Sequence, residues 1–202
     1  MIAIVDYGVG NLFSLRSSLK YIGADVVVTG SADELRRCDK IILPGVGAFA
    51  DAAAKLRDSG LDQCICQEAK QGKPLMGICL GMQMLFECSY EYGEHWGLGL
   101  IPGEIIPIEK VAPDVKIPHI GWNALHFSTP KHPLFNYIKE GDCVYFVHSY
   151  FADGCKDFTV ASTEYQAELT AAVAHENVMG CQFHPEKSGA VGLGILKAFC
   201  EM

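Results

Sequence analysis

The sequence has little positive charge, no long apolar run and no basic cluster. Sixteen Lys and Arg stand against 24 Asp and Glu, which gives a formal net charge of −8 and argues against nucleic acid as a partner. No window approaches the roughly 18 apolar residues that indicate a membrane span. The opening residues, MIAIVDYGVGN, lack the positive region and the apolar length of a signal peptide. We therefore expect a cytosolic protein.

Paired metal ligands are also missing. The nine cysteines are scattered and odd in number, and without a secretory signal we expect them to be reduced. Cys64 and Cys66 form the one close pair, but a spacing of two directs them to different faces of a helix. Because no second Cys or His pair at ligand spacing accompanies them, we predict no zinc site, and we expect no cofactor.

The overall composition is that of a globular protein with a sizeable core. Half of the 202 residues are apolar and one fifth are charged. No linker, internal repeat or low-complexity segment divides the chain. We therefore predict a single domain over residues 1–202.

Residues 1–88 alternate short apolar runs with segments of helical periodicity. Ser31-x-x-Glu34 matches a capping box at the start of the second helix. Strands that alternate with helices predict a mostly parallel sheet covered on both faces. The expected strands are 2–5, 24–28, 40–43 and 74–78, and the expected helices are 12–22, a short one after Ser31, 48–57, 61–70 and one that starts at Leu80.

After Cys88 the pattern changes. We expect a loop over 89–101, and then short β-branched or aromatic runs that predict a largely antiparallel region. His175-Glu176-Asn177 predicts a hairpin turn, and a final helix over 189–199 is expected to cover the sheet. The expected strands are 104–108, 122–127, 142–151, 158–163, 171–175 and 178–183.

Cys79 stands between the fourth expected strand and a helix, with Gly77 and Gly81 on either side. Glycine at these two positions permits the sharp turn of a nucleophile elbow, with cysteine in place of serine. The sulfur would be exposed at the strand end, and the helix N-terminus would favour the thiolate. A buried core cysteine beside two packing glycines explains the same stretch equally well.

A catalytic cysteine needs a base, and His184 has the best surroundings of the seven histidines. It ends an apolar run and has a carboxylate, Glu186, two residues further on. His184 would accept the thiol proton, and Glu186 would hold the imidazole in the useful tautomer. Alternatively, His184 is a surface residue beside a solvated glutamate. His148 is expected to pack or to line the substrate site rather than to act as the base.

Acyl transfer also needs donors for an oxyanion. The N–H of Leu80 follows the nucleophile, and Val46, between Gly45 and Gly47, supplies a second candidate. Glycine on both sides of Val46 permits a peptide plane to rotate, so this hole could form only with ligand bound. A tight strand-to-helix connection is the alternative. Such a site suits an amide or an ester.

Three of these motifs together resemble the class I (triad) glutamine amidotransferases. They are Gly77 to Gln83 (GICLGMQ), Pro44 to Gly47 (PGVG) and Phe183 to Glu186 (FHPE). The resemblance implies a flavodoxin-like α/β fold with a mostly parallel central sheet, helices on both faces, an antiparallel C-terminal extension and a Cys-His-Glu triad. It extends over essentially the whole chain.

Within that family the chain is similar to the glutaminase subunits of imidazole glycerol phosphate synthases, above all in DYGVGN (6–11) and PHIGWN (118–123). This similarity implies that Cys79 attacks the side-chain amide of glutamine through a thioester. It also implies a heterodimer with a (β/α)8 cyclase, which uses the ammonia to make imidazole glycerol phosphate and a purine precursor, AICAR. The implied substrate residues are Gly47, Gln83, Glu91, His148, Ser149 and Tyr150.

The same similarity implies that Asn11, Trp122, Tyr145 and Lys187 lie on or near the face that meets the cyclase. Tyrosine and tryptophan suit interfaces because each offers a large apolar area with one polar group. Composition alone would instead favour Trp122 as a core aromatic. If the partner controls the rotation of the peptide that joins Gly45 to Val46, glutaminase activity should be low in the isolated chain.

Three alternatives remain from the sequence. A cysteine peptidase or chaperone-like hydrolase of related fold could use the same elbow, but a histidine commonly follows its nucleophile, whereas Leu80 does here. A non-catalytic flavodoxin-like module is possible, although residues 6–11 lack the third glycine of a dinucleotide fingerprint. The third is a glutaminase subunit of an anthranilate or pyridoxal phosphate synthase, against which PHIGWN argues.

Overall fold

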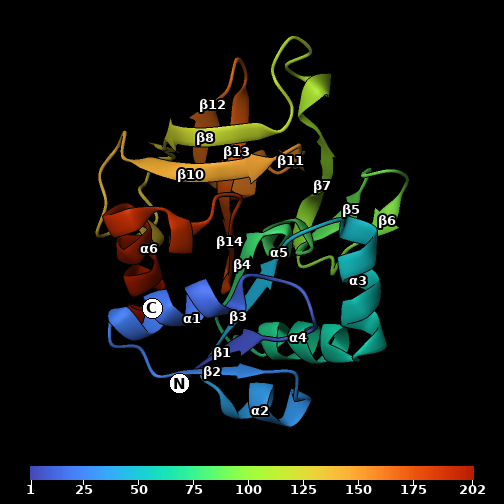
Figure 1. Ribbon diagram of the computed structural model, residues 1–202, viewed down its shortest axis with the longest axis vertical. Coiled ribbons are helices and arrows are strands. Elements are labelled where there is room, and N and C mark those ends of the chain that lie inside the picture. The colour runs from blue at the N-terminus through green and yellow to red at the C-terminus, as the bar shows by residue number, and fades with distance from the viewer.

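The computed structural model describes all residues, 1–202, and its main element is an eight-stranded sheet (Figure 1). The strand order is β2-β1-β3-β4-β14-β13-β12-β9, and the first five of these strands are parallel to one another. The order of these five matches the doubly wound flavodoxin-like arrangement. This confirms the predicted parallel sheet. The five strands are β1 (Ile2–Val5), β2 (Val26–Thr29), β3 (Lys40–Gly45), β4 (Leu75–Cys79) and β14 (Val178–Cys181).

Alternation along the buried strands creates two cores, one on each face of this sheet. Ile2 and Ile4 of β1 pack in the core that includes α1 and α6, whereas Ala3 and Val5 pack in the core that includes α2, α3 and α4. Helices therefore cover both faces, as the alternating pattern predicts. The helices are α1 (Leu12–Tyr21), α2 (Ala32–Arg37), α3 (Phe49–Asp58), α4 (Leu61–Lys70) and α6 (Gly189–Glu201).

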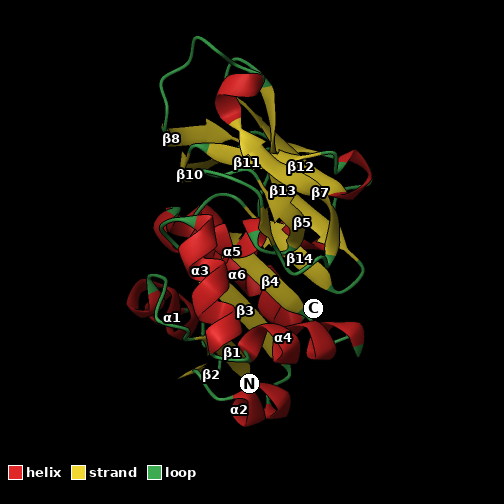
Figure 2. Cartoon of the chain, turned by 90° about the vertical axis from the view of Figure 1, so that its right-hand side faces the viewer, coloured by secondary structure: helices red, strands yellow, loops and turns green.

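Past β14 in the strand order, the large sheet becomes antiparallel. Together with two separate smaller sheets, this part forms the strand-rich upper half of Figure 2. The hairpin predicted around Glu176 joins β13 to β14. The strands of this half are β5 (Phe86–Ser89), β6 (His95–Trp96), β7 (Ile101–Pro107), β8 (His119–Ala124), β9 (His126–Phe127), β10 (Cys143–His148), β11 (Tyr150–Asp153), β12 (Thr159–Glu164) and β13 (Glu168–His175), with single-turn 3-10 helices at Ile108–Lys110, Pro133–Phe135, Lys156–Phe158 and Pro185–Lys187.

Three local expectations are wrong. The helix after Cys79 is only α5 (Leu80–Gln83), and the chain then enters β5, because pairing with β7 outweighs the helix propensity of the following residues. The expected loop over 89–101 contains β6, which pairs with β5. Ser31 precedes α2 but makes no side-chain capping bond, and its own N–H donates to the Thr29 hydroxyl at 2.9 Å.

The run expected as one strand over 142–151 is two strands. Residues of β10 pair with β8, and after Ser149 the chain changes partner, so that β11 pairs with β7. This change of partner brings residues 147–150 to the C-terminal edge of the parallel sheet. The longest helix, α6, has 13 residues, and none of the helices has both the length and the apolar character needed to cross a bilayer.

Candidate active site

Cys79 occupies a strained elbow at the end of β4. Its φ is +55° and its ψ is −114°, a conformation that non-glycine residues rarely adopt and that is concentrated at functional sites. A Cβ at Gly77 would lie 2.6 Å from the Gly81 carbonyl oxygen, and one at Gly81 would lie 1.8 Å from the Leu43 carbonyl oxygen. Both glycines are therefore required by close backbone approach, as the elbow predicts.

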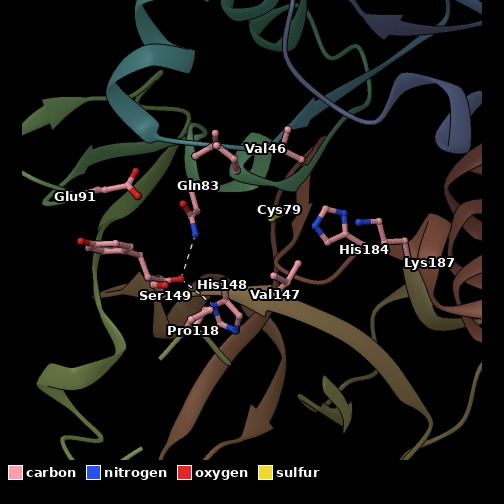
Figure 3. Close-up of a pocket in the computed structure, with 13 residues that line it drawn as sticks. Val46, Cys79, Gln83, Glu91, Pro118, Val147, His148, Ser149, His184 and Lys187 are labelled. Atoms are coloured by element: carbon pink, nitrogen blue, oxygen red, sulfur yellow. Dashed lines mark hydrogen bonds between the residues drawn. The ribbon is translucent and has the colours of Figure 1, made fainter. Parts of the chain in front are cut away.

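The Cys79 side chain faces a cavity but is not widely exposed. Only 8% of the residue is accessible, so the expectation of an exposed sulfur is wrong. The end of β10 contributes to this burial, because Val147 and His148 line the same cavity and lie across it from Cys79 in Figure 3. The alternative of a buried core cysteine holds in part, since Cys79 belongs to the core that includes α1 and α6, but it also lines the same cavity as His184 and is not enclosed.

His184 and Glu186 form a buried pair beside this cysteine. His184 Nδ1 lies 2.8 Å from Glu186 Oε1, and each side chain is 3% exposed. The alternative of a surface histidine with a solvated glutamate is thus wrong. Burial lowers the pKa of His184, but hydrogen bonds with Cys79 and Glu186 outweigh it and raise the pKa to about 9. The geometry therefore favours a charged imidazole between a sulfur and a carboxylate.

The backbone of His184 is held as firmly as its side chain. Its N–H donates to the Tyr145 carbonyl at 3.0 Å, and its carbonyl accepts from the Ser188 hydroxyl at 2.6 Å. The same hydroxyl accepts from the Tyr145 N–H at 3.0 Å. The chain after β14 is in this way tied to β10, which fixes the ring opposite Cys79.

Gln182 is a residue of this site that the sequence did not single out. It is fully buried, and its Nε2 lies 3.8 Å from Cys79 Sγ, within the range of a weak hydrogen bond to sulfur. Its Oε1 accepts from Gln83 Nε2 at 2.9 Å, and Gln83 Nε2 also donates to the Tyr150 carbonyl at 3.1 Å. A signal was present, since a glutamine within an apolar run must find buried partners.

The cavity has a volume of about 280 Å³, near the small end of the range for small-molecule sites. Figure 3 shows Glu91 toward one end, Gln83 between, and Cys79 and His184 toward the other. All predicted catalytic and substrate residues except Glu186 line it, and so do both predicted oxyanion residues. Its walls are Val46, Gly47, Cys79, Leu80, Gln83, Glu91, Pro118, Val147, His148, Ser149, Tyr150, His184 and Lys187.

Val46 lies on the loop after β3, directly beside the elbow. Gly45 pairs with Cys79 in the sheet, and a Cβ at Gly45 would lie 2.7 Å from the Gly81 nitrogen. Gly47 has a φ of +90°, in the left-handed region. The N–H of Val46 makes no hydrogen bond to another residue, so it is available to a ligand.

The hydrogen bonds of His148 leave no ring nitrogen free to act as a base. Its Nδ1 lies 2.8 Å from the Tyr150 carbonyl and its Nε2 lies 2.9 Å from His119 Nδ1. Burial lowers the pKa of His148 to about 3, which keeps the ring neutral. Both nitrogens are therefore engaged, in agreement with the expectation that His148 packs and lines the site.

The sequence model of the family "Glutamine amidotransferase class-I" matches residues 3–201. The chain belongs to this family. As in a glutamine amidotransferase, its site lies at the carboxyl ends of parallel strands, here β3, β4 and β14, which is where open α/β sheets place their ligands.

Relatives of this amidotransferase carry a more specific name. The "Imidazole glycerol phosphate synthase subunit HisH" of Caldanaerobacter subterraneus subsp. tengcongensis is 49% identical over 203 residues, which covers 100% of this chain and 98% of that protein. The protein of the same name from Sulfurimonas denitrificans is 49% identical over 98% of this chain and 97% of its own length. The one from Lactococcus lactis is 46% identical over 99% and 98%.

Solved amidotransferase structures share the fold at much lower identity. A crystal structure described as a glutamine amidotransferase matches with a TM-score of 0.76 and 17% identity, over 98% of this chain and 99% of that one. PurLQS from Thermotoga maritima matches with a TM-score of 0.77 and 21% identity, over 99% and 97%. These likenesses confirm the predicted class I glutamine amidotransferase fold.

Three of the four residues predicted to meet a partner of this amidotransferase lie near one another. The rings of Trp122 and Tyr145 are 6.0 Å apart in an edge arrangement, and Lys187 Nζ lies 5.9 Å from the Tyr145 ring. Trp122 is 56% exposed, so the alternative of a core aromatic is wrong. Asn11 caps α1 through its side chain and lines a small cavity with Glu186.

Proposed function

We propose that this chain is the glutaminase subunit of an imidazole glycerol phosphate synthase, working as one domain in the cytoplasm. The observation that carries the proposal is that Cys79 and His184 line one side of a cavity that also holds the Glu91 carboxylate. Glu186 lies behind His184 and is hydrogen-bonded to it. The near-50% identity to subunits of that name, over the whole chain, supports the choice of synthase.

Cys79 is the nucleophile of this proposal. The proton of its thiol passes to His184, which gives the charged imidazole described above, and the sulfur attacks the side-chain amide carbon of glutamine. The tetrahedral intermediate collapses when His184 returns the proton to the amide nitrogen, which leaves as ammonia. Water then attacks the glutamyl thioester with His184 as base, and glutamate departs as the thiol is restored. Glu186 keeps the imidazole oriented and stabilises its positive form.

The cavity supports glutamine in one orientation. The Glu91 carboxylate would pair with the α-ammonium group, and the amide would then reach Cys79. Gln83, Gly47 and residues 148–150 supply the polar groups that hold the amino acid end. The N–H groups of Val46 and Leu80 are the proposed donors to the oxyanion.

The proposed partner is a (β/α)8 cyclase subunit that receives the ammonia and makes imidazole glycerol phosphate and AICAR. Asn11, Trp122, Tyr145 and Lys187 form the proposed face of contact. Trp122 supplies the exposed aromatic area that interfaces favour, and Lys187 lies both on this face and at the cavity wall.

A diazo-ketone analogue of glutamine tests the activity. It should alkylate the wild-type chain together with its cyclase and leave Cys79→Ser unlabelled, with mass spectrometry as the readout. No labelling of the wild-type complex would indicate a non-catalytic module. Glutamine hydrolysis should be slow in the isolated chain and faster once the cyclase and its ligand are added, and equal rates would count against control by the partner. Formation of a stable complex with an anthranilate synthase subunit instead of the cyclase would contradict the choice of synthase.

A further inference from the structure

Two hydrogen bonds hold the ends of the loop that carries Val46. At one end the hydroxyl of Tyr7 donates to the Pro44 carbonyl at 2.8 Å. At the other end the N–H of Phe49, the first residue of α3, donates to the Glu91 carboxylate. Both Tyr7 and Glu91 are distant from the loop in sequence, so each bond ties the loop to a separate part of the fold.

Tyr7 forms a fixed end because it is itself buried. The residue is 6% exposed and packs in the core that α2, α3 and α4 share. It does not line the cavity, so its hydroxyl contacts the backbone of the loop and not the substrate. Gly45 follows directly and is pressed against the elbow, where a Cβ would lie 2.7 Å from the Gly81 nitrogen. The chain up to Gly45 is therefore held in place.

Glu91 forms the other end through an unusual helix cap. Ala48, the N-cap residue of α3, has no side chain able to accept a hydrogen bond, and Glu91 supplies the acceptor from the loop after β5. The oxygen that accepts from Phe49 is Oε2, while Oε1 makes no hydrogen bond to the protein. Because Glu91 also lines the cavity, one carboxylate serves both the loop and the ligand site.

Between these two ends the loop is free. Val46 is 41% exposed, its N–H has no partner within the protein, and a Cβ at Gly47 would meet nothing within 4 Å. Backbone rotation is thus left to the peptides between Gly45 and Phe49. The peptide that must turn if the Val46 N–H is to face the oxyanion is the one that joins Gly45 to Val46.

We propose that Tyr7 and Glu91 are positioning residues that confine this rotation, and that glutamine reinforces the second of them. The inference rests on the proposed function. When the α-ammonium group of glutamine pairs with Oε1 of Glu91, it fixes the carboxylate whose Oε2 caps α3. Occupancy of the amino acid end of the cavity is thereby linked to the geometry of the loop at the reacting end.

Tyr7→Phe in the complex with the cyclase is the first test. It removes only the hydroxyl, so the nucleophile, the cavity and the pairing of β3 with β4 stay intact while the Pro44 carbonyl loses this donor. We expect kcat for glutamine hydrolysis to fall about 10-fold, because a misplaced oxyanion donor costs much of its effect, and KM to change less than about twofold. Tyr21→Phe, which alters a tyrosine that is 81% exposed, is the matched control and should leave both constants unchanged.

Glu91 is tested by two substitutions. Glu91→Gln keeps an oxygen for the Phe49 N–H and loses the charge, so it should raise KM at least about 10-fold with kcat within about threefold of wild type. Glu91→Ala loses both the charge and the acceptor for the Phe49 N–H, so its kcat should be about 10-fold lower than that of Glu91→Gln. A Tyr7→Phe variant with unchanged kcat, or equal kcat in the two Glu91 variants, would overturn the inference.

Labelling by the diazo-ketone analogue separates this inference from the proposed function. If the wild-type complex is not labelled at Cys79, the proposed function fails and the loop has no oxyanion to serve. If the wild type is labelled and active while Tyr7→Phe matches it in kcat, only the positioning role fails. Labelling of Tyr7→Phe by iodoacetamide should keep the wild-type rate, because the sulfur and His184 are not altered.

Discussion

Glu186 Oε1 lies 2.8 Å from His184 Nδ1, while the second oxygen of the same carboxylate, Oε2, is buried without a partner. A buried carboxylate with one unmet acceptor is costly, and its one strong contact is to the imidazole. The Glu186 carboxylate therefore favours the charged state of His184, although its second oxygen stays without a partner.

Glu186→Gln should lower kcat for glutamine hydrolysis by about 100-fold or more, in the range expected for a disabled acid–base group. An amide can still accept from Nδ1, but it does not stabilise the imidazolium. The measurement is steady-state glutamate production by the complex with the cyclase. Glu176→Gln, at an exposed turn between β13 and β14, is the control and should keep the wild-type kcat. A Glu186→Gln enzyme within threefold of wild type would exclude Glu186 from the triad.

The pH dependence of stability should reveal the same group. The pKa of His184 in the folded chain is raised to about 9, above the value near 6.5 of a free imidazole. Protonated His184 therefore stabilises the fold below pH 6.5, and this contribution disappears as the pH rises through about 9. Urea unfolding of wild type and His184→Asn should show a difference in unfolding free energy that shrinks between pH 6.5 and 9. A difference independent of pH in this window would show that His184 is not charged in the folded chain.

The elbow gives a prediction about stability. Gly81→Ala would place a Cβ 1.8 Å from the Leu43 carbonyl oxygen, so α5 and β3 must separate, and we expect the unfolding free energy to fall by about 3 kcal/mol or more. Gly23→Ala is the matched control, because Gly23 has a φ of +82° but open space around it, and it should cost only about 1 kcal/mol. Urea unfolding measures both. Equal losses would mean that the chain relieves the clash by moving, so that the close approach of Leu43 does not make glycine necessary at position 81.

The sequence predicted the elements of the parallel half and the meeting of Cys79, His184 and Glu186 because their signals are local. Cys79 lies between two glycines, and His184 stands at a strand end two residues from its carboxylate, so short windows are enough. Parallel order then brings the carboxyl ends of β4 and β14 to one edge, since these strands are neighbours. Residues far apart in the chain meet at this edge for that topological reason.

What the sequence did not predict depends on distant contacts. Gln182 meets Gln83 across 99 residues, and no short window indicates which buried amide another will find. The early end of α5 depends on β5 pairing with β7, and the α3 cap comes from Glu91 and not from a neighbouring residue. At Ser31 the local signal of a capping box is present, but the capping bond does not form. The Ser31 N–H donates instead to the hydroxyl of Thr29.

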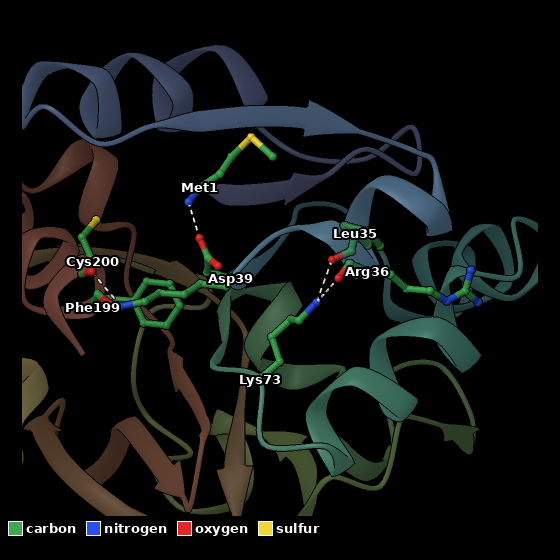
Figure 4. A network of polar contacts seen from close by, with 8 residues as sticks. Met1, Leu35, Arg36, Asp39, Lys73, Phe199 and Cys200 are labelled. Carbon is green, nitrogen blue, oxygen red and sulfur yellow. Dashed lines mark hydrogen bonds and ion pairs between the residues drawn. The ribbon is translucent and has the colours of Figure 1, made fainter.

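Lys73 joins two helices at the edge of the parallel half, as Figure 4 shows for its contacts with α2. Its Nζ donates to the carbonyls of Leu35 and Arg36 at 3.0 and 2.9 Å, near the end of that helix, where a positive charge is favourable. It also lies 2.6 Å from the Glu68 carboxylate of α4, and the two side chains are 13% and 9% exposed. The lysine therefore serves as a cap and as the partner of a mostly buried charge.

Lys73→Met should lower the unfolding free energy by about 3 kcal/mol, because it leaves Glu68 buried without its cation. Adding Glu68→Leu should restore part of this loss, since a buried apolar pair can replace an ion pair. Lys197→Met provides the control: its 3.9 Å contact with Glu201 is about half exposed and should be worth less than about 1 kcal/mol. Neither Lys73 nor Glu68 lines the cavity, so kcat should stay at the wild-type value at 25 °C. If Lys73→Met and Lys197→Met lose equally little in urea unfolding, the Glu68 carboxylate is hydrated and the pair does not stabilise the junction of α2 and α4.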